Sequence, residues 1–228
     1  MNQFPLLVLA VSLTASLASS QEIRPLDWSK IEGGASDDEL VNLCATVLKH
    51  TQKDIGRDWL DKVADTPDVD GLLDFARIDG SSKKRRRRAI EDCIRPVTTS
   101  CRTLALAIRG GVCGGVYDEA QAGASIAEIE SLFPLVLRSL AKDHVVHGGI
   151  GKETWGDSWQ SAMWAGQLAQ AAWIFWDQLA PEDRELVTAV LIHESNRFLD
   201  VPPPTSDKKS TVDTKGEENF WNASCLLT

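Results

Sequence analysis

Apolar residues recur at helical spacing through the second half of this chain, and this periodicity constrains the fold more than any other feature. Ser125 precedes the clearest run and Glu128 follows three residues later, which is the capping-box pattern of a helix start. The apolar face after this start is Ile126, Ile129, Leu132, Phe133, Val136, Leu137 and Leu140. A sustained alternation of apolar and polar residues with hairpin turns, which would indicate strands, is not found. The fold is therefore predicted to be all-α.

Two further segments predict a pair of antiparallel helices. The first helix is expected to start near Asp157 and is apolar on two faces, so we expect it to pack on both sides. One face carries Trp159, Met163, Gly166, Gln170 and Trp173. The other face carries Trp164, Leu168, Ala171, Phe175 and Leu179. Pro181, followed by two acidic residues, signals a second helix that continues to about Leu199. Because only a few residues separate the two helices, they are predicted to be antiparallel neighbours.

Shorter helical patterns come earlier in the chain. Acidic residues 37–39 suit the first turn of one helix, and residues 59–63 belong to a second. Residues 72–75 mark another short segment. The stretch 89–108 has helical spacing, and Pro96 is expected to kink or divide it.

The N-terminus has the pattern of a secretory signal peptide. Residues 5–18 are almost wholly apolar, and Ala18-Ser19-Ser20 fits a small-residue cleavage site. The run is too short to span a bilayer comfortably, although an uncleaved N-terminal anchor is the alternative. We therefore predict a signal peptide at 1–20, a helical domain at 21–228, and a secreted or periplasmic location. No later segment has the ~20 unbroken apolar residues of a transmembrane helix.

Charge and cysteine content exclude several kinds of site. The net charge of −9 argues against nucleic-acid binding. The basic run 83–88 is interpreted first as a solvated loop or helix start; a processing site and a clamp for an acidic polysaccharide are the alternatives.

A Cys101–Cys113 disulfide is possible across a Gly-rich turn, and buried free thiols are an equally good interpretation. The cysteine and histidine spacings match no zinc motif, so no metal or cofactor is predicted.

Two polar segments are richer in functional groups than packing requires. In 152–161, Trp155 and Trp159 are candidate platforms for stacking sugar rings, and Asp157 is a candidate catalytic acid or base. The segment 213–222 adds Glu217 and Glu218 as catalytic candidates, Asn219 to hold a hydroxyl or carboxylate, and Trp221 as a further sugar platform. The competing interpretation is that Trp155 and Trp159 lie in the core and that Glu217 only caps a helix.

Histidines supply a second set of candidates. His144, His147 and His193 could each act as a base or a metal ligand, and His147 is the one chosen as catalytic. His193-Glu194 lies on a predicted helix, but the second histidine of the HExxH motif is missing. A zinc-protease site is therefore rejected.

Several of these motifs resemble exported (α/α) toroid proteins. The matching residues are the runs 157–161 and 218–222, Trp173 and Trp176-Asp177, within roughly residues 125–228. The group includes six-hairpin glycosidases and the alginate lyase and heparinase II/III families. The resemblance implies antiparallel helical hairpins forming part of a toroid, and lyase- or glycosidase-like action on a polysaccharide or oligosaccharide. A non-catalytic helical scaffold or binding module of the cell envelope is the alternative.

The final residues read as the opening of an apolar helix that lacks a closing signal. Residues 220–228 contain neither a terminal Gly nor a basic last turn. The chain also has fewer helical segments than the toroid resemblance implies. We therefore expect it to be the N-terminal part of a longer protein, with an open helical arc and poor coverage of Trp221 and Leu226. The sequence specifies no oligomeric state.

Overall fold

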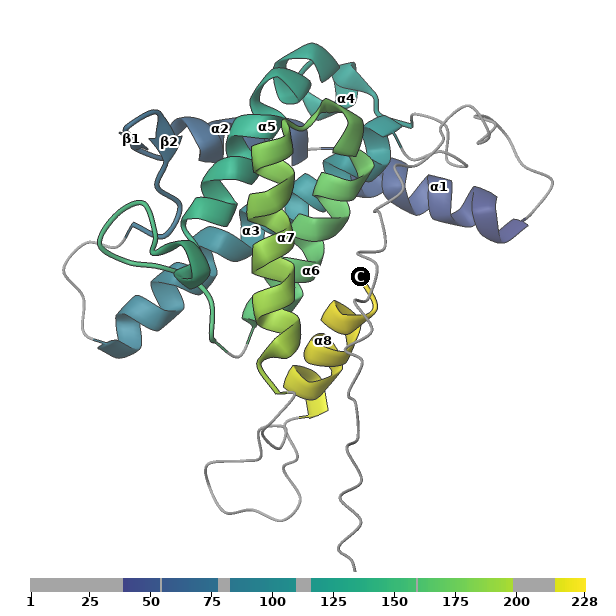
Figure 1. The fold of residues 1–228 in the computed structure, drawn as a ribbon. Coiled ribbons are helices and arrows are strands. Elements are labelled where there is room, and N and C mark those ends of the chain that lie inside the picture. Colours follow the sequence, from purple (N-terminus) through teal and green to yellow (C-terminus); the bar gives the residue numbers. More distant parts are fainter. Residues whose placement is uncertain (1–38, 54, 78–82, 110–115, 159, 199–215) are drawn as a thin grey trace, which may run out of the picture.

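The fold is all-α, as predicted (Figure 1). The computed structural model describes residues 39–53, 55–77, 83–109, 116–158, 160–198 and 216–228. Within these residues the α-helices are α1 (Glu39–Thr51), α2 (Ile55–Ala64), α3 (Lys83–Arg109), α4 (Glu119–Ala122), α5 (Ile126–Lys142), α6 (Ser161–Ile174), α7 (Pro181–Asn196) and α8 (Gly216–Leu226). Short 3₁₀ turns lie at η3 (Val145–His147) and η4 (Trp176–Gln178). The predicted signal peptide lies outside the described residues.

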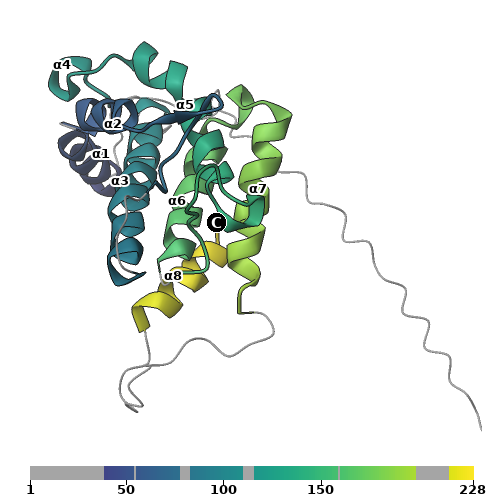
Figure 2. The ribbon, with the colours of Figure 1, turned by 90° about the vertical axis from the view of Figure 1, so that its left-hand side faces the viewer.

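Helix α6 occupies the middle of the bundle. It packs against α3, α7 and α8, and Figure 2 shows it between α3 and α7. Trp164 and Leu168 are buried on one side, while Gly166 faces Cys225 of α8 on another. The prediction of a helix buried on two faces is confirmed, although Trp173 is 41% exposed. Its predicted bounds were too wide, because α6 starts at Ser161 rather than near Asp157 and ends before Phe175 and Leu179.

The predicted start signals of α5 and α7 are confirmed. The Ser125 hydroxyl accepts the backbone N–H of Glu128, and the Glu128 carboxylate accepts the backbone N–H of Ser125, so the capping box is closed. Pro181 is the first residue of α7, which packs against α6 after a short connection. Helix α7 ends at Asn196, about one turn before the predicted end at Leu199.

Helix α3 is longer than predicted and is not divided at Pro96. The basic run 83–88 forms its first turns, which matches the helix-start interpretation. Cys101 of α3 is a buried free thiol that accepts the indole N–H of Trp59 at 3.3 Å. Cys113 lies outside the described residues.

Residues 72–75, grouped with the short helical patterns of the sequence, are not helical: residues 72–73 belong to a small β-hairpin that the sequence did not indicate. Strands β1 (Asp68–Val69) and β2 (Leu72–Leu73) pair antiparallel. Asp70 and Gly71 form the turn, with φ of 51° and 79°. Two successive positive φ angles identify a type I′ turn, for which Asp-Gly is a favoured pair. Strands of two residues are too short to give an alternating pattern, which explains the omission.

Apolar side chains remain exposed at both ends of the described chain. Helix α1 forms where predicted, but Leu40, Leu43 and Val47 are all more than half exposed. On α8, Cys225 is buried and Trp221 is half-buried, whereas Leu226 is 59% exposed. The predicted poor coverage is therefore correct for Leu226 and only partly correct for Trp221. Among the described helices, none combines the length and apolar character that a membrane span requires.

A buried carboxyl group ties the hairpin to the end of α5. Asp143 follows the last turn of α5 and is 0% exposed. One of its oxygens accepts the backbone N–H groups of Phe75 at 2.7 Å and Ala76 at 3.2 Å. Burial and, to a smaller extent, the nearby Asp74 carboxylate raise the pKa of Asp143 to about 7, against the lowering effect of the backbone donors.

This raised pKa predicts a distinctive pH dependence of stability. The native state holds a proton that the unfolded state releases, so the contribution of Asp143 to stability is lost as pH rises from about 4 to about 7. We expect the unfolding free energy of the wild type, relative to Asp143→Asn, to fall by roughly 2–3 kcal/mol between about pH 5 and pH 8. Urea unfolding at both pH values measures this difference.

The matched control is Asp70→Asn, at the exposed turn of the same hairpin, because Asn tolerates the same positive φ. Its pH profile should follow that of the wild type. Parallel profiles for Asp143→Asn and the wild type would contradict the assignment.

Candidate functional site

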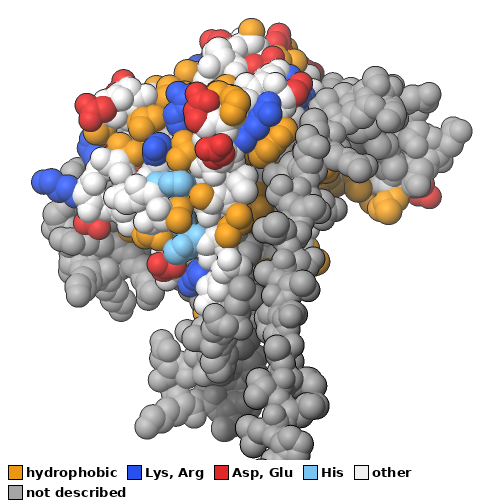
Figure 3. Space-filling view, viewed as in Figure 1, with side chains coloured by type: hydrophobic (Ala, Val, Ile, Leu, Met, Phe, Trp, Pro, Cys, Tyr) orange, Lys and Arg blue, Asp and Glu red, His pale blue; other side chains and the backbone are white. Residues whose placement is uncertain are grey.

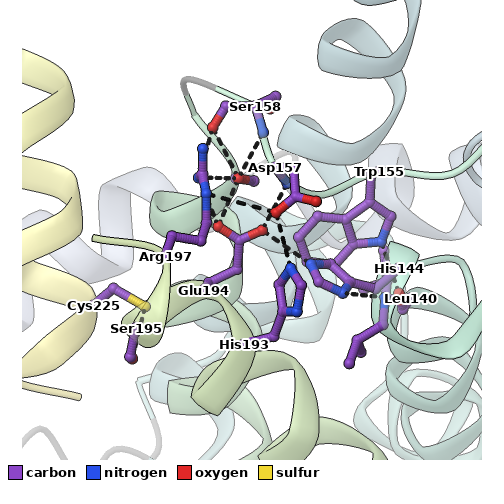
Figure 4. A network of polar contacts seen from close by, with 12 residues as sticks. Leu140, His144, Trp155, Asp157, Ser158, His193, Glu194, Ser195, Arg197 and Cys225 are labelled. Carbon is purple, nitrogen blue, oxygen red and sulfur yellow. Dashed lines mark hydrogen bonds and ion pairs between the residues drawn. The ribbon is translucent and has the colours of Figure 1, made fainter. Parts of the chain in front are cut away.

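The carboxylate of Glu194 on α7 is the centre of a buried polar network (Figure 4). One oxygen accepts Nε2–H of His144 and the backbone N–H of Asp157, each at 3.0 Å. The other accepts the hydroxyl of Ser161 at 2.7 Å and Nη1 of Arg197 at 2.8 Å. Four donors fill the lone-pair positions of the carboxylate. We call these five residues the Glu194 network.

The network keeps Glu194 ionised. Burial alone would raise its pKa, but the hydrogen bond from His144, the charge of Arg197 and the remaining donors together lower it to about 2. Arg197 also donates to the backbone oxygen of Ser158 and to the Ser161 hydroxyl, so it joins the loop before α6 to the end of α7. The charge of Glu194 is therefore balanced by a cation that has a structural role of its own.

His144 acts as a neutral donor in this network. Its ring is fully buried and meets the Trp155 ring edge-on at 4.5 Å. Nδ1 accepts the backbone N–H of Val146, so the proton must sit on Nε2, which donates to Glu194. Burial lowers the pKa of His144 despite the opposing effect of Glu194. With both nitrogens occupied, His144 cannot serve as the base that the sequence analysis considered.

The loop 155–158 adopts an unusual backbone that aims its groups in opposite directions. Gly156 has φ of 119°, and a Cβ at this position would lie 2.6 Å from Nε2 of His144. Asp157 follows with φ of 48°, a conformation that few non-glycine residues adopt. This backbone points the N–H of Asp157 inward to Glu194. The Asp157 carboxylate faces outward to His193.

The outward-facing groups form an exposed Asp157–His193 pair. Nε2 of His193 lies 2.8 Å from a carboxylate oxygen of Asp157, and Nε of Arg197 lies 3.7 Å from the same oxygen. The side chains are 31% exposed for His193 and 58% for Asp157. Figure 3 shows histidine side chains on this face, with acidic and basic side chains beside one of them. Since an ionised carboxylate accepts, Nε2 of His193 carries a proton, and in the neutral imidazole Nδ1 then carries the lone pair.

Asp157, His193 and Glu194 also lie close enough to suggest a metal site. Their ligand atoms are all within 4.8 Å of one another. However, the oxygens of Glu194 already accept four hydrogen bonds, and the Arg197 cation stands beside both carboxylates. A metal ion would have to displace these donors and overcome the charge of Arg197. The donor set does not fit a metal, and we derive no chemistry from one.

Of the residues chosen as site residues whose side chains the structure describes, Asp157 lies in this cluster, together with His144 and His193, which were considered as a base or a metal ligand. His147 lies on η3 and donates its Nε2–H to the backbone oxygen of Leu186 at 3.0 Å. Leu186 precedes His193 by two helical turns, about 10 Å along α7. Trp155 is 1% exposed and donates its indole N–H to the Leu140 carbonyl, so it has no face for a sugar. The prediction of Trp155 as a stacking platform is therefore corrected: it belongs to the core.

The remaining predicted residues are placed less fully. Trp159 lies outside the described residues. The backbone of Glu217 and Glu218 lies in the first turn of α8, and their side chains are outside the described part of the chain. Asn219 and Trp221 are half-buried on α8.

Sequence reasoning missed the network that supports the site. His193 was considered as a base or a metal ligand, Glu194 only as part of a metal motif, and Arg197 was not considered. The spacing of Glu194 and Arg197, three residues apart on one helix, was an available signal for an ion pair. Nothing in the local pattern indicated that this pair would be buried, or that Ser161 would reach it from α6.

Comparison with known proteins found no matching family model, no similar curated protein and no similar solved structure. The site is therefore interpreted from its own geometry.

The network predicts that Glu194 is critical for stability. In Glu194→Gln the charge that balances Arg197 is lost, and an amide NH₂ faces two former donors. We expect a loss of about 3–5 kcal/mol in the free energy of unfolding, measured by urea denaturation. Glu185→Gln, an exposed position on the same helix, is the matched control and should change stability by less than about 0.5 kcal/mol. Equal losses for the two variants would refute the role of the network.

Proposed function

We propose that this chain is an exported carbohydrate-active protein that acts on a polysaccharide, with the Asp157–His193 pair as its proton-transfer group. The observation that carries the proposal is the 2.8 Å contact of an exposed histidine with a carboxylate held in place by a buried network. The polysaccharide class is supported by the resemblance of residues 125–228 to helical toroid proteins. An all-α fold with packed helical pairs is compatible with that resemblance.

The pair is suited to act as a general base. Asp157 accepts Nε2–H of His193, which leaves the lone pair of the neutral imidazole on Nδ1. Nδ1 then takes the proton from the carbon next to the carboxylate of an acidic sugar. The resulting electron pair forms a carbon–carbon double bond as the bond to the leaving glycosidic oxygen breaks, and that oxygen takes a proton from solvent.

This arrangement favours a lyase over a glycosidase. Glycosidases generally need two carboxyl groups that both face the scissile bond. The carboxylate grouped with Asp157 and His193 is Glu194, which is buried and fully hydrogen-bonded. A single base beside a carboxylate meets the needs of β-elimination.

A non-catalytic scaffold or binding module is the second candidate. The saturated Glu194 network and the buried Trp155 favour it, because both stabilise the fold without needing a ligand. On this view the Asp157–His193 pair only ties the loop 155–158 to α7.

Variants of the pair separate the two candidates. A panel of acidic and neutral polysaccharides is incubated with the protein, and cleavage is followed by the ultraviolet absorbance of unsaturated products and by reducing ends. Because general-base catalysis contributes about 10²–10⁴-fold, we expect His193→Gln to lower turnover by at least about 100-fold, with little change in the unfolding midpoint. Asp157→Asn should also lower turnover.

The control is His50→Gln, at an exposed position on α1, which should retain full turnover. Cleavage that survives His193→Gln, or no cleavage across the whole panel, would count against the catalytic proposal.

A further inference from the structure

A small cavity lies against the loop that presents Asp157. Its volume is about 30 Å³, and it lies between residues 90–91 of α3, the loop 154–158 and α6. The lining residues are Ile90, Glu91, Thr154, Trp155, Gly156, Ser158 and Trp164. This volume accommodates one group of the size of a water or hydroxyl and is too small for a sugar ring. We call it the Trp164 niche.

Two polar atoms of the niche lack partners. The indole of Trp164 is 1% exposed, and its Nε1–H has no acceptor. The buried hydroxyl of Ser158 also has no partner. Trp155 shows the usual arrangement, since its indole N–H reaches the Leu140 carbonyl at 2.8 Å. A buried N–H without an acceptor is unfavourable and rare, so an oxygen from outside the protein is expected to fill this position.

The charge of the niche selects which kind of oxygen can enter. Glu91 contributes a carboxylate to the lining, which accepts the side-chain amide of Gln160 and lies 3.7 Å from Arg95. Negative potential from Glu91 disfavours a carboxylate or other anionic oxygen. A neutral hydroxyl can accept from Trp164 and donate to Ser158. These are the two or more polar partners that such a bound group requires.

We propose that the Trp164 niche binds one neutral hydroxyl oxygen, held by the indole N–H of Trp164 and the hydroxyl of Ser158. In the free protein this oxygen belongs to a water molecule. The ligand class rests on the proposed function: a hydroxyl group of the polysaccharide replaces the water. Gly156 and Ser158 of the niche flank Asp157 in the sequence, so the niche and the proton-transfer pair share one loop, and Glu91 disfavours a sugar carboxylate within the niche.

The experiment follows the indole N–H resonance of Trp164 in ¹⁵N-labelled full-length protein, assigned with Trp164→Phe. The probes are methyl glucoside, methyl galactoside and the methyl glycoside of glucuronic acid. We expect a saturable shift of the Trp164 resonance with at least one neutral glycoside and weaker binding of the uronate. Ser158→Ala should lower the affinity for the neutral glycoside by about threefold to tenfold, which is the effect of losing one hydrogen bond.

Ser131→Ala is the matched control, because its exposed hydroxyl bonds only to a backbone oxygen of its own helix. It should leave the affinity unchanged. If the Trp164 N–H shows magnetisation transfer to a bound water but does not respond to any glycoside, the niche is a water site only, and the assignment to a ligand is overturned. A resonance that shows neither effect would overturn the niche altogether.

The outcomes for the niche and for the proposed function are separable. A Trp164 shift that persists in a protein without turnover on any polysaccharide supports the niche and counts against catalysis. Turnover that depends on His193 but is accompanied by no Trp164 shift supports catalysis and overturns the assignment of a ligand to the niche.

Discussion

A carboxylate placed inside a helical bundle is stable only if donors surround it, and this requirement at Glu194 organises the site. The four donors come from the N-cap of η3, the loop before α6, the start of α6 and the C-cap of α7. Each donor fixes the segment that carries it, so one buried charge holds four parts of the chain in a defined arrangement. Breaking such a network is costly because the partner charge remains buried.

The geometry of the exposed pair follows from this arrangement. Because Glu194 draws in the backbone N–H of Asp157, the loop must take the positive φ angles seen at Gly156 and Asp157. His193 and Glu194 are neighbours on α7, so one points to the rim while the other points inward. The chemical group at the surface is thus positioned by residues that contact no ligand, which is the arrangement expected of a preorganised site.

The sequence predicts the helices of this protein better than its site. The periodicity of 126–140, the Ser125–Glu128 capping box and the Pro181 restart act within a few residues, and all three were read correctly. The burial of Glu194 depends on residues up to 50 positions away, which a local pattern does not reveal. The prediction for Trp155 was wrong for a related reason. An aromatic residue near a helix start has the same sequence pattern whether its ring is exposed or buried.

The central claim is that Glu194 is an anion that accepts Nε2–H of His144, while burial keeps the His144 ring neutral. Nitrogen-15 NMR of the imidazole rings tests this directly, because the shifts of the two ring nitrogens differ between tautomers and change on protonation. We predict the Nε2–H tautomer for His144 and no protonation near the usual pKa of about 6.5. Titration of His144 near that value, or a proton on Nδ1, would contradict it.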